Sequence, residues 1–111
     1  MKTRPLGTSD IQVTPICFGG NVFGWTLDQK QSFRLLDQLV DHGWNFIDTA
    51  DMYSRWKPGN VGGESETILG EWFARSGKRD QVVLTSKVGM DMGAGRVGLK
   101  AAYIMQAVED S

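Results

Sequence analysis

Hydrophobic residues follow two alternating spacings along this chain. Short continuous apolar runs, of the length typical of buried strands, occupy residues 15–20, 44–47 and 82–87. After each run, apolar residues recur three or four positions apart, which is typical of one face of an amphipathic helix. Because the order of strand and then helix repeats along the chain, the pattern predicts parallel strands joined by helical crossovers.

Capping residues indicate where the first two helices begin and end. Thr26 and Gln29 have the spacing of a capping box, so we expect the first helix to begin there. Gly43 is expected to end it as a left-handed cap. Ser65 is the expected N-cap of the second helix, and Gly77 is expected to end that helix.

The two ends of the chain have patterns of their own. Residues 1–14 contain two short extended segments around the turn residues 7–10, which predicts a hairpin. A third helix is expected to begin near Leu99, and its apolar face is formed by Ala101, Ile104, Met105 and Val108. This pattern runs to Ser111 without a terminating residue, so we expect the chain to be a piece of a longer protein.

Both a doubly wound sheet and a barrel satisfy this order of elements. Residues 19–24 lack the Gly-x-Gly-x-x-Gly spacing of a dinucleotide-binding turn. Polar residues also gather after the second and third strands, the face on which barrel enzymes place their chemistry. Within the α/β class, both observations favour a (β/α)8 TIM barrel over a doubly wound sheet. Residues 1–111 would form the N-terminal part of one barrel domain, with a hairpin at 1–14 and β/α units at about 15–43, 44–77 and 81–111.

Composition and charge exclude several classes of function. The 12 basic and 13 acidic residues are mixed along the chain and give a net charge of -1, so no nucleic-acid partner is expected. No apolar run approaches the roughly 20 residues of a membrane span, and the N-terminus lacks a signal-peptide core, so no membrane partner is expected either. The single cysteine, Cys17, is interpreted as a small buried hydrophobe in a reducing cytoplasm, with a reactive thiol as the alternative.

Three residues that follow predicted strands form the candidate chemistry. Asp48 ends the second strand, Lys87 ends the third, and Tyr53 lies in the loop after Asp48. Because adjacent parallel strands end at the same edge, Asp48 and Lys87 are expected to meet, with Tyr53 folded back over both. A phenol beside an ammonium that a carboxylate orients can give a proton to a carbonyl oxygen that has accepted hydride. The alternative is that the lysine is a solvated strand end and that Asp48 caps a turn.

Several segments resemble the aldo-keto reductase superfamily, in particular the bacterial members related to potassium-channel β-subunits. The matching segments, in the family's order, are residues 5–9, 18–24, 43–54, 63–66 and 84–87. The stretch Phe46-Ile47-Asp48-Thr49-Ala50-x-x-Tyr53 is highly specific. The resemblance implies a barrel whose base the N-terminal hairpin closes, and NADPH-dependent reduction of aldehydes and ketones to alcohols.

The resemblance also assigns roles to residues. Tyr53 would be the catalytic acid, Lys87 its electrostatic partner and Asp48 the orienting carboxylate, which also lies near the nicotinamide ribose. Gly20 and Asn21 fall where the family contacts the cofactor, although many relatives carry threonine at the position of Gly20. The rim-loop residues that would border a pocket for a small carbonyl substrate, or else simply pack in their loops, are Trp25, Trp56 and Met90. No metal site is predicted.

One family feature is missing. The family's catalytic histidine follows the fourth strand, whereas the only histidine here, His42, lies at the end of the first predicted helix, away from the site. Most contacts to the NADPH phosphate and adenine would also lie beyond Ser111, so the chain alone is expected to be inactive. Two alternatives stay open: a nucleotide-binding regulatory subunit of the channel β-subunit type, and a short protein completed by self-association as a homo-oligomer.

Overall fold

A three-stranded parallel sheet forms the centre of the computed structural model, which describes residues 1–111. Its strands are β3 (Phe18–Gly19), β4 (Phe46–Asp48) and β5 (Val83–Thr85), in the order β3-β4-β5. The pairing places Gly19 opposite Asp48, and Asp48 opposite Thr85. The prediction of parallel strands is therefore confirmed, and the ends of all three strands lie at one edge of the sheet.

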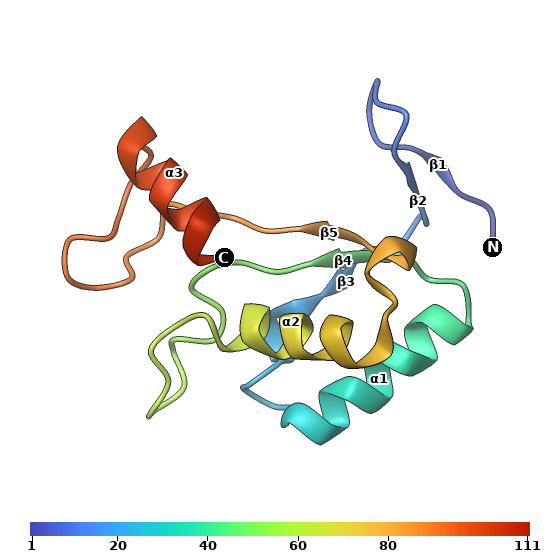
Figure 1. Ribbon diagram of the computed structural model, residues 1–111, viewed down its shortest axis with the longest axis horizontal. Coiled ribbons are helices and arrows are strands. Elements are labelled where there is room, and N and C mark those ends of the chain that lie inside the picture. Colours follow the sequence, from blue (N-terminus) through green and yellow to red (C-terminus); the bar gives the residue numbers. More distant parts are fainter.

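Two helices cover one face of this sheet (Figure 1). They are α1 (Gln29–Asp41) and α2 (Glu64–Ser76), and the 3-10 turns η1 (Gly20–Val22) and η2 (Arg79–Gln81) lie on the connections. The helix ends are as predicted, since Gly43 and Gly77 adopt φ angles of 83° and 69°, in the left-handed region that glycine tolerates. No helix is both long and apolar enough to span a membrane.

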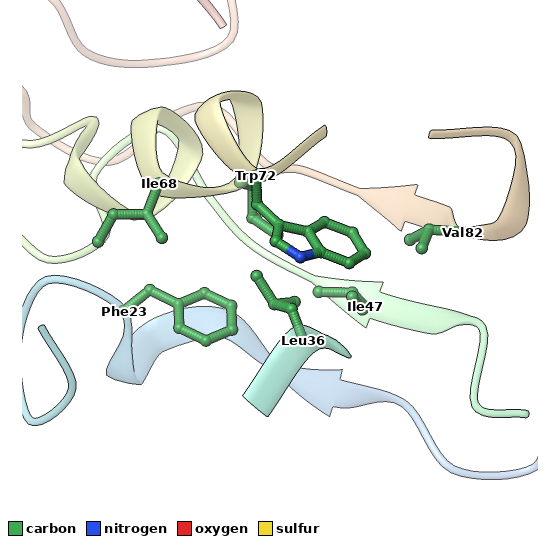
Figure 2. Close-up of a cluster of buried hydrophobic side chains, with 7 residues drawn as sticks. Phe23, Leu36, Ile47, Ile68, Trp72 and Val82 are labelled. Atoms are coloured by element: carbon green, nitrogen blue, oxygen red, sulfur yellow. The ribbon is translucent and has the colours of Figure 1, made fainter. Parts of the chain in front are cut away.

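The hydrophobic core lies between the sheet and these two helices (Figure 2). Trp72 of α2 packs at its centre with 1% of its surface exposed, and its indole Nε1 donates a hydrogen bond of 3.1 Å to Asp37 of α1. The remaining buried members come from the residue after η1, from both helices, from β4 and from the residue before β5: Phe23, Leu36, Ile47, Ile68, Leu69 and Val82. Because Ile47 of β4 is in this core, the next residue, Asp48, points to the opposite face of the sheet.

The first helix begins later than predicted. Asp28 is its N-cap, and its Oδ1 accepts a hydrogen bond of 2.8 Å from the Gln31 backbone N–H, while Gln31 Oε1 accepts one of 3.0 Å from Asp28 N–H. Thr26 instead donates its backbone N–H to the Val22 carbonyl in a preceding turn. The capping box of Thr26 and Gln29 was therefore wrong, because this turn already uses the Thr26 backbone.

The second helix also begins differently. Its N-cap is Gly63, with φ of 85°, and the Glu64 carboxylate accepts the free N–H groups of Val61 and Gly62. Ser65 lies inside the first turn, and its buried hydroxyl bonds to the Gly20 carbonyl. Ser65 is therefore not a cap, because its side chain points into the fold.

The N-terminal hairpin lies beyond the end of the sheet at which the strands begin (Figure 1). It consists of β1 (Arg4–Pro5) and β2 (Gln12–Val13), paired antiparallel as predicted. Asn45, directly before β4, accepts a hydrogen bond of 2.8 Å from Thr14 N–H and donates one of 2.9 Å to the Gln12 carbonyl. This amide fixes the hairpin to the sheet.

The predicted burial of Cys17 was wrong. Cys17 is exposed, because the face of the sheet opposite α1 and α2 has no covering layer. The third helix, α3 (Ala101–Asp110), lies beyond the other end of the sheet (Figure 1), and only Ala107 of this helix is buried. Two residues of its predicted apolar face, Met105 and Val108, are 66% and 63% exposed.

Candidate active site

The structure brings the three candidate catalytic side chains together at the C-terminal edge of the sheet. Asp48 is the last residue of β4, and Lys87 follows β5 by two residues. Lys87 Nζ lies 2.7 Å from Asp48 Oδ2 in an ion pair. The predicted meeting of these two side chains is therefore confirmed as geometry.

Tyr53 lies beside this ion pair. Lys87 Nζ is 4.7 Å from the centroid of the Tyr53 ring, within the range of a cation–π contact. The Tyr53 backbone is fixed on both sides, since its N–H donates to the Ala50 carbonyl at 3.2 Å and its carbonyl accepts from Ser65 N–H at 3.0 Å. The loop after β4 therefore carries the phenol back over the sheet edge.

The ammonium of Lys87 has a second partner besides Asp48. Its Nζ also donates to the Thr49 carbonyl at 2.7 Å. Partial burial acts against the charge of the ammonium, but Asp48 and Tyr53 outweigh burial and raise the pKa of Lys87 above its ordinary value. Lys87 is thus a fixed positive charge next to the phenol at neutral pH.

Thr85 is a site residue that sequence reasoning missed. Its Oγ1 donates a hydrogen bond of 2.7 Å to Asp48 Oδ1, which leaves Oδ2 for Lys87. The spacing of Thr85 and Lys87 could have indicated this role, because side chains two positions apart on a strand share a face of the sheet. It became usable only with the register that pairs Thr85 with Asp48.

Gly20 and Asn21, the predicted cofactor residues, lie in η1 directly after β3. Gly20 is buried, and a Cβ built on it would lie 2.8 Å from the Asp48 carbonyl oxygen. The Gly20 carbonyl accepts the Ser65 hydroxyl at 2.7 Å, so it points into the fold. The close approach of η1 to β4 therefore gives a packing reason for glycine here. Asn21 is half-buried at the same edge.

An aromatic cluster continues from Tyr53 along the rim. Tyr53 and Trp56 have ring centroids 5.5 Å apart, and Trp56 and Trp25 are also 5.5 Å apart, both pairs meeting edge to face. Trp25 and Trp56 are 44% and 41% exposed. Met90, the third predicted rim residue, is also exposed. The two tryptophans thus form an apolar surface next to the phenol.

Two further titratable groups lie near the site. Asp51 Oδ1 is buried without a hydrogen-bond partner. Burial is the largest effect on this carboxyl, and together with the charge of Glu66 it raises the pKa of Asp51, while the Met52 backbone and the charge of Arg96 oppose the rise. Although Cys17 is exposed as a residue, loss of some water around its thiol and the charge of Asp48 raise the pKa of this thiol, while Lys87 opposes them. His42 is remote, since it caps the end of α1 and its Nδ1 lies 2.8 Å from the Gln38 carbonyl.

Known proteins share this arrangement of elements. Residues 15–111 match the model of the Aldo/keto reductase family. An uncharacterized 11.2 kDa protein of Pseudescherichia vulneris is 57% identical over 101 residues, which cover 90% of this chain and 98% of that protein. An uncharacterized oxidoreductase of Bacillus subtilis is 42% identical over 89 residues, which cover 79% of this chain and 26% of that protein.

A solved structure extends the likeness to three dimensions. An aldo-keto reductase of Bacillus halodurans, in its holo form, superposes with a TM-score of 0.77 and 34% identity, over 99% of this chain and 35% of that one. The chain thus spans nearly all of the Pseudescherichia protein but only 26% and 35% of the other two. Its hairpin and three β/α units correspond to the N-terminal part of the family's (β/α)8 barrel, and the chain belongs to the aldo/keto reductase family.

Proposed function

We propose that this chain carries the proton-donating part of a carbonyl-reducing site that uses NADPH. One observation carries the proposal: Lys87 Nζ is 2.7 Å from Asp48 Oδ2 and 4.7 Å from the centroid of the Tyr53 ring. The carboxylate, the ammonium and the phenol together form a general acid, because the ammonium lies beside the phenol that becomes negatively charged when it gives up its proton. The family membership supports an oxidoreductase that acts on aldehydes or ketones.

Each of the three residues has a separate task. Tyr53 gives its hydroxyl proton to the carbonyl oxygen as that oxygen becomes an alkoxide. Lys87 stabilises the negative charge that then develops on the phenol oxygen, because an opposite charge nearby favours the ionised form. Asp48, held by Thr85, keeps the ammonium charged and fixed in place.

The residues at this edge also fit a nicotinamide cofactor. The cofactor supplies the hydride when bound. Asp48 and Asn21 would lie toward its nicotinamide ribose, whereas the Gly20 carbonyl already accepts the Ser65 hydroxyl, so Gly20 would contribute a close backbone approach and no hydrogen bond through that carbonyl. Trp25 and Trp56 would exclude water from one side of the Tyr53 phenol. Exclusion of water strengthens the electrostatic interaction between the phenol and Lys87.

A fusion protein tests this function. The chain would replace the matched N-terminal part, 35% of the length, of the Bacillus halodurans reductase, which supplies the remaining barrel. We expect the fusion to oxidise NADPH in the presence of a nitrobenzaldehyde. Tyr53→Phe should lower kcat by at least about 100-fold, the lower range for loss of a general acid, while NADPH binding by fluorescence titration persists.

Two controls accompany this test. The 111-residue chain by itself should show no detectable NADPH oxidation, because it spans only part of the barrel. Circular dichroism should show that the parent fusion and its Tyr53→Phe variant are equally folded. Equal turnover by these two proteins would refute the assignment of Tyr53 as the acid.

A further inference from the structure

A buried pair of hydroxyls joins the segments that carry the site residues. Ser65 Oγ lies 2.7 Å from the Gly20 carbonyl oxygen and 2.7 Å from Thr49 Oγ1, and both hydroxyl residues are 0% exposed. A carbonyl oxygen can only accept, so the single hydroxyl proton of Ser65 goes to Gly20. Thr49 must therefore donate to Ser65, and each proton of the pair has one defined acceptor.

The same two residues hold the site through their backbones. The Thr49 carbonyl accepts Lys87 Nζ at 2.7 Å, and the Thr49 N–H donates to the Thr85 carbonyl at 2.8 Å. At the other end, the Ser65 N–H donates to the Tyr53 carbonyl at 3.0 Å. A continuous path of short bonds therefore runs from the ammonium of Lys87, through Thr49 and Ser65, to the backbone of Tyr53.

We infer that the Thr49–Ser65 hydroxyl pair is a positioning element that sets the distance between Lys87 and Tyr53. Thr49 follows β4 and Ser65 lies in the first turn of α2, so their hydrogen bond joins two segments that are 16 positions apart in sequence. Loss of the Ser65 hydroxyl leaves the Thr49 proton without its acceptor and the Gly20 carbonyl without its donor, whereas loss of the Thr49 hydroxyl removes only the donor to the buried Ser65 oxygen. In both cases the bond between the two segments is lost, so the segments must rearrange, and the Tyr53 loop moves with Ser65. The consequence for catalysis rests on the proposed function; the geometric consequence does not.

Nuclear magnetic resonance of the 111-residue chain tests the geometry without any need for activity. The variants are Ser65→Ala and the isosteric Thr49→Val, and the signals are the Lys87 side-chain titration and the Tyr53 ring shifts. We expect both variants to lower the pKa of Lys87 and to shift the Tyr53 ring signals. Thr49→Ser keeps the hydroxyl and should retain the wild-type signals.

Ser32 provides a matched control. It is also a serine with 0% exposure in a helix, and its Oγ donates to the Asp28 carbonyl at the start of its own helix at 2.7 Å, so this bond joins no site segment. Ser32→Ala should therefore destabilise the fold to unfolding by urea but leave the Lys87 and Tyr53 signals unchanged. Equal changes in Ser32→Ala, or unchanged signals in Ser65→Ala and Thr49→Val, would overturn the inference. Should Ser65→Ala fail to fold, Thr49→Val against Thr49→Ser decides it.

The fusion protein adds the catalytic consequence. Ser65→Ala and Thr49→Val should lower kcat by about 10- to 100-fold, the effect of a small misplacement of reacting groups, with little change in KM for the aldehyde. Tyr53→Phe separates the two claims. If Tyr53→Phe keeps full turnover while Ser65→Ala and Thr49→Val change the resonances, the proposed function fails and the positioning role stands. If Tyr53→Phe loses turnover while Ser65→Ala and Thr49→Val leave the resonances unchanged, the positioning role fails.

Discussion

Substitution of Gly20 by alanine tests whether close packing or free backbone explains the glycine at this position. A Cβ on Gly20 would lie 2.8 Å from the Asp48 carbonyl oxygen and 3.3 Å from both Phe23 Cδ2 and Ser65 Oγ. The nearest atom is backbone, and it belongs to a strand that pairs with β3 through Gly19 and Asp48. The clash therefore cannot be relieved by rotation of a flexible side chain.

Two effects of opposite sign compete in Gly20→Ala. The φ angle of Gly20 lies outside the left-handed region, so alanine fits its backbone and would stabilise the fold by about 0.4–1 kcal/mol through the unfolded chain. Overpacking of a tight contact costs about 1–3 kcal/mol. The cost of the clash exceeds the gain through the unfolded chain over most of these two ranges. We therefore expect a net loss of about 1 kcal/mol in the free energy of unfolding, which lowers the melting temperature by roughly 4 °C in a domain of this size.

Gly70 is the matched control, because it has the opposite surroundings. It lies within α2, and a Cβ there would meet nothing within 4 Å. Gly70→Ala should therefore raise stability by about 0.5–1 kcal/mol, the cost of glycine in a helix interior. Both variants would be measured by urea denaturation, followed by tryptophan fluorescence.

The opposite signs of the two changes are the critical result. If Gly20→Ala is as stable as the wild type, or gains stability as Gly70→Ala does, then η1 does not approach β4 as closely as the structure places it. The packing reason for Gly20 would then be refuted, and a role of its bare backbone toward the cofactor would be the remaining explanation.

Three further predictions concern charge and packing. The pKa of Lys87 is raised in the folded state, so its stabilising contribution is present below the unfolded pKa of about 10.4 and is lost as pH rises through the folded value. The stability difference between wild type and Lys87→Met, below about 1 kcal/mol for this half-exposed pair, should therefore shrink in urea melts above that pH, and a constant difference would contradict the ion pair. The pKa of Asp51 is also raised, so its ionisation costs stability: Asp51→Asn should be more stable than wild type at pH 7, and the gain should fade toward about pH 4. Ile47→Ala, at a site only 1% exposed, should cost about 2–5 kcal/mol by the same assay, and a loss below about 1 kcal/mol would show that the core of Figure 2 does not close over β4.

Local signals in the sequence predicted helix ends better than helix starts. Gly43 and Gly77 end α1 and α2 as expected, because a left-handed residue is needed there whatever surrounds it. Thr26 and Ser65 were wrong as caps, since a hydroxyl side chain can bond to any nearby carbonyl or amide. The turn at Val22 and the contact with Gly20 use these residues for other purposes, and neither is visible from spacing.

The sequence by itself determined the order of strands and helices, the parallel sheet and the candidate set of Asp48, Tyr53 and Lys87. These follow from hydrophobic periodicity and from residue types at strand ends, which are local properties of the chain. Only the tertiary structure decided that Thr85 holds Asp48, that Ser65 and Thr49 join the site segments, and that Cys17 and the apolar face of α3 are exposed. The physical reason is that burial and hydrogen-bond partners depend on strand register and on which faces have a covering layer, and both are set by contacts between distant residues.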